Sequence, residues 1–98
     1  MASVRRQRTF LVECYAPGIG QADVEAVGER AARAAALRDE GRAIDYQRAL
    51  FVPGDEAVLH IFTAADADTV REAGRRAAIS FDRVVESVAI RPARRHVR

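Results

Sequence analysis

The chain has 98 residues, a net charge of +2 and 49% apolar residues, values typical of one small globular domain and not of a disordered chain. No apolar run approaches the roughly 20 residues of a membrane span, and no apolar segment follows the basic N-terminus as a signal peptide requires. The single cysteine, Cys14, excludes an internal disulfide and is typical of a reducing cytoplasm. We therefore expect a cytoplasmic protein with no membrane partner.

The charge is distributed unevenly along the chain. All sixteen basic residues are arginine, seven of them lie outside residues 9–90, and no acid lies outside that range. Because the whole chain carries +2 and its ends carry +7, residues 9–90 carry −5. An acidic body with basic ends is unlike a dedicated nucleic-acid surface, so we expect no specific nucleic-acid partner. We expect residues 1–8 to be a disordered basic arm and residues 91–98 a basic tail.

Six segments bounded by turn residues predict secondary structure between residues 9 and 90. Alternation of side chains at period two predicts strands over residues 9–16, 43–52, 57–63 and 84–90. Apolar residues at helical spacing predict helices over residues 21–40 and 66–78. The order β-α-β-β-α-β is that of a ferredoxin-like α+β domain. We expect one antiparallel sheet with strand order 4-1-3-2 and both helices on one face.

Four features of the sequence indicate where the elements begin, end and approach each other. Gly41 suits the end of the first helix, since it adopts positive φ without a Cβ penalty. The run from Pro53 to Glu56 predicts the turn between the second and third strands. Asp66 is a favourable N-cap for the second helix. Gly74, in the middle of that helix, indicates close packing.

Three ionisable residues fall near the middle of strands that are adjacent in the expected sheet. Glu13, His60 and Glu86 each have the parity that we assign to the face without helices. Two carboxylates and an imidazole are a plausible ligand set for a divalent cation, or a general acid and base. The alternative is a hydrogen-bonded polar cluster at a dimer interface. The catalytic residues, if the protein is an enzyme, stay unassigned.

Tyr15, Tyr46 and Arg48 are candidates for binding a small-molecule ligand or cofactor on the same face. The loop between the two middle strands decides where Arg48 lies: three residues place it opposite His60, four opposite Ile61. A slip of one residue turns a side chain to the other face, so both alternatives stay open. Cys14 has the parity of the core and no cationic neighbour, and we interpret it as a core thiol.

Three stretches resemble a family of small bacterial ferredoxin-like proteins of unknown function, which includes a dimeric, nickel-binding and nickel-responsive protein. They are Leu11 to Gly18, Tyr46 to Glu56 and Ala64 to Val88. The resemblance implies the fold, a homodimer and binding of a divalent metal, nickel in the best-described branch. This chain has only one histidine in residues 9–90, so no ligand residue is carried over from the family.

Three hypotheses of function follow from the sequence. The first is a dimeric metal-binding or metal-responsive accessory protein that uses Glu13, His60 and Glu86. The second is a dimeric α+β-barrel binding module or enzyme with a cavity on the open sheet face, with His60 or Glu13 as acid or base. The third is a structural assembly protein in which the polar cluster fixes the dimer register.

Overall fold

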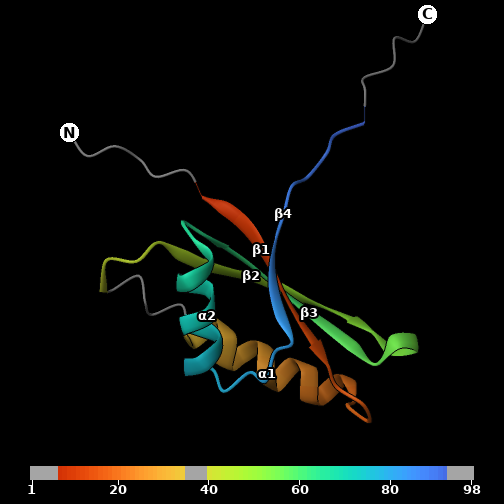
Figure 1. The fold of residues 1–98 in the computed structure, drawn as a ribbon. Coiled ribbons are helices and arrows are strands. Elements are labelled where there is room, and N and C mark those ends of the chain that lie inside the picture. The colour runs from red at the N-terminus through yellow and green to blue at the C-terminus, as the bar shows by residue number, and fades with distance from the viewer. Residues whose placement is uncertain (1–6, 35–39, 93–98) are drawn as a thin grey trace, which may run out of the picture.

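The computed structural model describes residues 7–34 and 40–92. Its elements follow the predicted order (Figure 1). They are β1 (Arg8–Tyr15), α1 (Gln21–Ala34), β2 (Ile44–Val52), β3 (Ala57–Ala64), α2 (Ala67–Arg76) and β4 (Arg83–Ser87), with a 3₁₀ turn at Pro53–Asp55. Among these described residues, no helix is long and apolar enough to cross a membrane. Most of the predicted basic arm and tail, and residues 35–39 of the predicted first helix, lie outside them.

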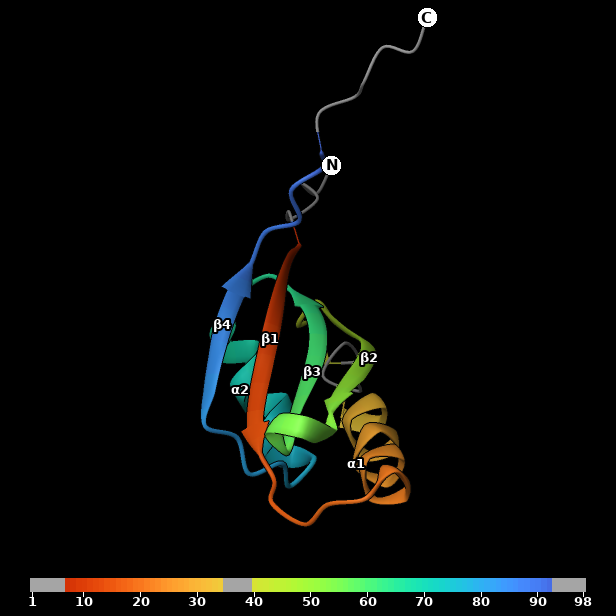
Figure 2. The same cartoon turned by 90° about the vertical axis from the view of Figure 1, so that its right-hand side faces the viewer.

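The four strands form one antiparallel sheet in the order β2-β3-β1-β4, which is the predicted order read from the other edge. Figure 2 shows the strands side by side with both helices behind them. The prediction of a ferredoxin-like α+β fold is therefore confirmed. We call the covered side of the sheet the helix face and the other side the open face.

Local signals of the sequence position α2. The backbone N–H of Thr69 donates to Oδ1 of Asp66 at 2.8 Å, so Asp66 is the predicted N-cap. A Cβ added to Gly74 would lie 2.8 Å from Cε1 of Phe81, which confirms the predicted close packing. Gly41 has a φ of +83°, a conformation that glycine adopts without a Cβ penalty; residues 35–39, which separate it from the last described residue of α1, Ala34, lie outside the described residues.

Strand β4 is shorter than predicted. It ends at Ser87, whereas the sequence pattern extends to Ile90. Among the described residues β4 pairs only with β1, and their pairing ends at Thr9 and Ser87, one residue after β1 begins at Arg8. Beyond Ser87 the chain has no neighbouring strand among the described residues. Val88 and Ile90, which the alternation predicted to lie in the strand, are therefore 72% and 81% exposed.

The core lies between the helices and the helix face of the sheet. Alternate residues of β1 and β3 are buried there, because successive side chains of a strand point to opposite faces. The buried set comprises Phe10, Val12 and Cys14 of β1 and Val58, His60, Phe62 and Ala64 of β3. His60 lies directly opposite Val12 in the register, so it belongs to this core.

The predicted face of β3 is therefore wrong. We expected His60 on the open face and Leu59 and Ile61 beneath the helices, but the structure reverses both. The middle of the strand, residues 58–62, is apolar on both faces apart from His60, so its alternation does not indicate which face lies beneath the helices. His60 is 1% exposed because a hydrogen bond compensates its burial.

The predicted face of Glu86 is also wrong. It lies opposite Phe10, on the helix face, at a part of β4 where its side chain stays 40% exposed. An ion pair of 3.2 Å with Arg8 holds it there. The charge of Glu86 correctly predicted an exposed side chain but not its face. The helix face is buried only where a helix covers it, and the side chain of Glu86 stays exposed on that face.

A β-bulge interrupts β2. Tyr46 lies opposite Phe62 and Arg48 opposite Ile61, so Gln47 is an extra residue in this strand. The hairpin pairs Val52 with Ala57 across four residues, which selects the alternative that places Arg48 opposite Ile61. The bulge turns Tyr46 to the helix face and leaves Arg48 on the open face, although residues two apart normally share a face.

Candidate ligand-binding pocket

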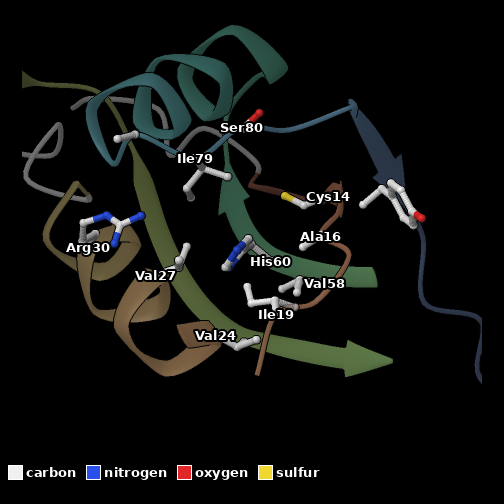
Figure 3. A pocket seen from close by; sticks show the side chains of 12 residues that line it. Cys14, Ala16, Ile19, Val24, Val27, Arg30, Val58, His60, Ile79 and Ser80 are labelled. Carbon is white, nitrogen blue, oxygen red and sulfur yellow. The ribbon is translucent and has the colours of Figure 1, made fainter. Parts of the chain in front are cut away.

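A cavity of about 190 Å³ lies between the helix face of the sheet, helix α1 and the segment that follows α2 (Figure 3). Its walls are mainly apolar: Ile19, Val24 and Val27 contribute from one side, and Val58 and Ile79 from the sheet and the end of α2. A cavity of about 150 Å³ with apolar walls holds benzene. The space here therefore suits a ligand of about eight non-hydrogen atoms.

The end of α2 places Ile79 at this cavity. Ala78 has a φ of +56°, its N–H donates to the carbonyl of Arg75 at 3.0 Å, and the N–H of Ile79 donates to the carbonyl of Gly74 at 2.9 Å. These two bonds define a Schellman motif, in which the residue after the left-handed position turns back to the core. Alanine occupies the position where glycine is usual.

His60 lines the cavity, and Tyr46 holds its ring from the side away from the cavity lining. The hydroxyl of Tyr46 lies 3.1 Å from Nδ1 of His60 and has no other hydrogen-bond partner among the described residues. Because a half-buried hydroxyl proton needs an acceptor, we assign Tyr46 as the donor and Nδ1 as the acceptor. Burial raises the pKa of Tyr46, which keeps this proton in place. Gly28 leaves room for the hydroxyl, since a Cβ there would lie 3.2 Å from it.

The tautomer of His60 follows from this bond. With Nδ1 as acceptor, the proton of the neutral ring is on Nε2. In the part of the chain that the structure describes, Nε2 has no hydrogen-bond partner, and no buried side-chain nitrogen lacks one. Nε2 is therefore at the surface of the cavity, which the ring lines. Burial, and secondarily the charge of Arg30, lower the pKa of His60 from 6.5 to about 4, so the ring is neutral at pH 7.

Arg30 brings a positive charge to the same cavity. Its Nε donates to the carbonyl of Ala77 at 2.8 Å, which fixes the side chain against the end of α2. Figure 3 shows Arg30 and His60 extending toward each other from opposite sides. The guanidinium has no carboxylate partner among residues 7–34 and 40–92. No aspartate or glutamate of the described ranges lines the cavity.

Cys14 is the remaining reactive group at the cavity. It is buried, as predicted for a core thiol, and lies on β1. Burial and the nearby charge of Asp82 raise the pKa of its thiol to about 11. The carboxylate of Asp82 accepts a hydrogen bond of 2.6 Å from the N–H of Tyr15. Cys14 is thus a neutral, weakly polar part of the wall at pH 7.

The three predicted metal ligands do not come together. Glu13 is on the open face in an ion pair of 2.8 Å with Arg83, while His60 is in the core and Glu86 is paired with Arg8. Within the described ranges, no three histidine, cysteine, aspartate or glutamate residues are close enough to hold a metal ion. The expectation of a shared site failed because it depended on the faces of β3 and β4.

The predicted ligand-binding residues also separate. Tyr46 lies on the helix face and bonds to His60, but it does not line the cavity itself. Tyr15 is 64% exposed at the end of β1, where it belongs to the rim of the cavity. Arg48 is exposed on the open face and does not line the cavity. Sequence reasoning missed Arg30, although it lies three residues after Val27 and thus on the apolar stripe of α1.

A second, wider depression of about 820 Å³ lies between α1 and β2. Its lining includes Glu25 and Glu29 but no arginine, histidine or cysteine. Tyr46 borders it as well, so this side chain separates the depression from the cavity at His60. The smaller cavity is the better candidate site, because polar groups converge there on an apolar space.

Comparison of the chain with protein-family models, with curated proteins and with solved structures found no match. The assignment of a function therefore depends on the geometry of the chain itself.

Proposed function

We propose that this protein is a small-molecule-binding module whose ligand occupies the cavity between α1 and the helix face of the sheet. The observation that carries the proposal is the convergence of Arg30 and the Nε2 of His60 on an apolar space of about 190 Å³. Binding sites for small molecules are mostly apolar with a few convergent polar groups. A structural histidine needs only its bond to Tyr46, whereas this one also presents a donor to the cavity.

The test is a screen of small aromatic and aliphatic compounds by NMR, with chemical-shift changes assigned to residues. Binders are expected to shift Val27, Ile79 and His60 together. Val27→Phe, which fills the cavity, is expected to abolish these shifts, whereas Ala26→Phe, at the exposed neighbouring position, is expected to leave them. Shifts confined to the open face, or equal binding by both variants, would contradict the proposal.

We also propose that a second copy of the chain covers the open face. Leu11, Leu59, Ile61 and Val85 are only half-buried there, and Leu50 is 44% exposed. The face also carries both signs of charge, with Glu13 and Arg83 side by side and Arg48 on β2. A surface that pairs with its own copy must be complementary to itself, which a mixed apolar and oppositely charged face satisfies.

Light scattering is the measurement for this dimer. The wild-type chain is expected to give the mass of two copies, and Leu50→Arg the mass of one, because it buries a charge in the contact. Ala26→Arg, on the exposed side of α1, is the control and is expected to stay dimeric. A monomeric wild-type chain, or a dimeric Leu50→Arg variant, would refute the contact.

Nickel binding stays a prediction of the family resemblance. Of the three residues first considered, only His60 lines the cavity, and Cys14 is the other metal-binding side chain there. Two ligands are fewer than divalent-metal sites commonly use. Calorimetric titration with nickel tests this second function, and binding that survives His60→Gln would assign the metal to another part of the chain.

A further inference from the structure

Arg30 and His60, the polar side chains of the cavity that are not exposed at its rim, are both hydrogen-bond donors at pH 7, whereas the rim residues Tyr15 and Ser80 carry hydroxyls that can also accept. Arg30 provides the two terminal nitrogens of its guanidinium, neither of which has a partner among the described residues. The N–H of His60 at Nε2 is the second donor. The thiol of Cys14 is neutral and only weakly polar. The described part of the lining offers no carboxylate to satisfy these groups.

Arg30 is half-buried and has no anion beside it among the described residues. Removing a charged group from water carries a penalty that a paired opposite charge offsets. Elsewhere in the structure the arginines with ion pairs lie at the surface, as Arg76 does with Glu40 and Glu72. Arg30 is instead anchored by one bond to a carbonyl and extends into the molecule. This arrangement supplies a charge to the cavity without supplying its partner.

We propose that the ligand of this cavity is a small monocarboxylate with a short apolar or aromatic body. The carboxylate accepts hydrogen bonds from the guanidinium of Arg30 and from Nε2 of His60, and the body fills the space between Val27, Val58 and Ile79. This inference rests on the proposed function, since it names the ligand class for the same site. A planar guanidinium matches a carboxylate in geometry as well as in charge.

The chemistry of the site disfavours two other ligand classes. A cationic ligand would meet Arg30 without a compensating acid. A neutral apolar ligand would fill the walls but leave the donors of Arg30 and His60 without acceptors, which lowers its affinity relative to an acid of the same shape. The limited volume excludes a nucleotide or another large anion from full enclosure.

The experiment compares benzoate with benzyl alcohol, its neutral counterpart of similar shape, by calorimetry and NMR at pH 7. Benzoate is expected to bind at least about tenfold more tightly than the alcohol, as charge-assisted bonds are the stronger ones. Arg30→Met, which keeps the apolar stem, is expected to reduce benzoate affinity by about tenfold or more and leave the alcohol unchanged. Arg33→Met, at an exposed position of the same helix, is the matched control.

A second readout reports the position of the carboxylate directly. A negative charge beside His60 stabilises its protonated form, so benzoate is expected to raise the pKa of His60, and benzyl alcohol is not. NMR titration of the ring proton measures this shift. If Arg30 had a purely structural role, the Arg30→Met variant would still bind benzoate more tightly than benzyl alcohol.

The possible results separate the two proposals. Equal affinity for both probes at the cavity, with Arg30→Met unchanged, would overturn the carboxylate and leave the binding module standing. Absence of binding by either probe up to its solubility would overturn both. Equal weakening by Arg30→Met and Arg33→Met, with no shift at His60, would mean that benzoate associates with surface arginines and would overturn the carboxylate site.

Discussion

Acid is expected to destabilise this protein through His60. The pKa of this imidazole is about 4 in the folded chain and 6.5 for an ordinary histidine. Protonation therefore favours the unfolded chain, and the contribution of His60 to stability is complete above pH 6.5 and decreases as the pH falls toward 4. One pKa unit corresponds to about 1.4 kcal/mol. At pH 5 the loss is roughly 2 kcal/mol, because the folded protein cannot yet take up the proton that the unfolded chain binds.

The assay is urea denaturation of the wild-type chain and of His60→Gln at pH 7 and pH 5. The variant keeps an acceptor for Tyr46 but cannot titrate, so the groups common to both proteins cancel in the comparison. The free energy of unfolding of the wild type is expected to fall by roughly 2 kcal/mol more than that of the variant over this interval. Equal changes in the two proteins would show that His60 is not a buried neutral imidazole.

Three further predictions concern the packing around α2 and the thiol beside the cavity. Gly74→Ala is expected to destabilise the fold by about 1–3 kcal/mol in thermal unfolding, because the added Cβ lies 2.8 Å from Phe81, whereas Gly54→Ala meets no atom within 4 Å and is expected to be neutral. Ala78→Gly is expected to stabilise the fold by about 1 kcal/mol, since it relieves a left-handed alanine; a destabilised variant would contradict this. Cys14 is expected to react with iodoacetamide at pH 8 only when urea unfolds the chain, and rapid labelling of the native protein would contradict its burial and its raised pKa.

The sequence allowed the architecture to be predicted because each element has a local signal. Asp66 begins α2 with a side-chain bond that depends only on neighbouring residues. Gly74 in a helix indicates contact with a neighbour, although not that this neighbour is Phe81. Such signals operate within a few residues, so element order and the approximate bounds follow from them.

The site was not predictable because it depends on which face each strand presents. Strand β3 has apolar residues on both faces, so only tertiary contacts decide that Val58, His60 and Phe62 face the helices. The polar character of His60 suggested the opposite, and its bond to Tyr46 across a bulge was not visible in the pattern. Arg30 shares the stripe of Val27, yet an arginine at that position usually extends to solvent.

The register of β2 places Tyr46 beside His60, and deletion of the extra residue Gln47 tests this account of the strand. Deletion of Gln47 would restore regular pairing with Tyr46 still opposite Phe62 and Arg48 still opposite Ile61, so every side chain would keep its face. Deletion of Ala49 would instead place Arg48 opposite His60, beneath the helices, with its charge buried. Denaturation is expected to show a cooperative fold for the first deletion and its loss for the second. If the deletion of Gln47 abolished cooperative unfolding as the deletion of Ala49 is expected to, the bulge itself would be needed for the fold. The register of β2 alone would then not explain why Tyr46 lies against His60.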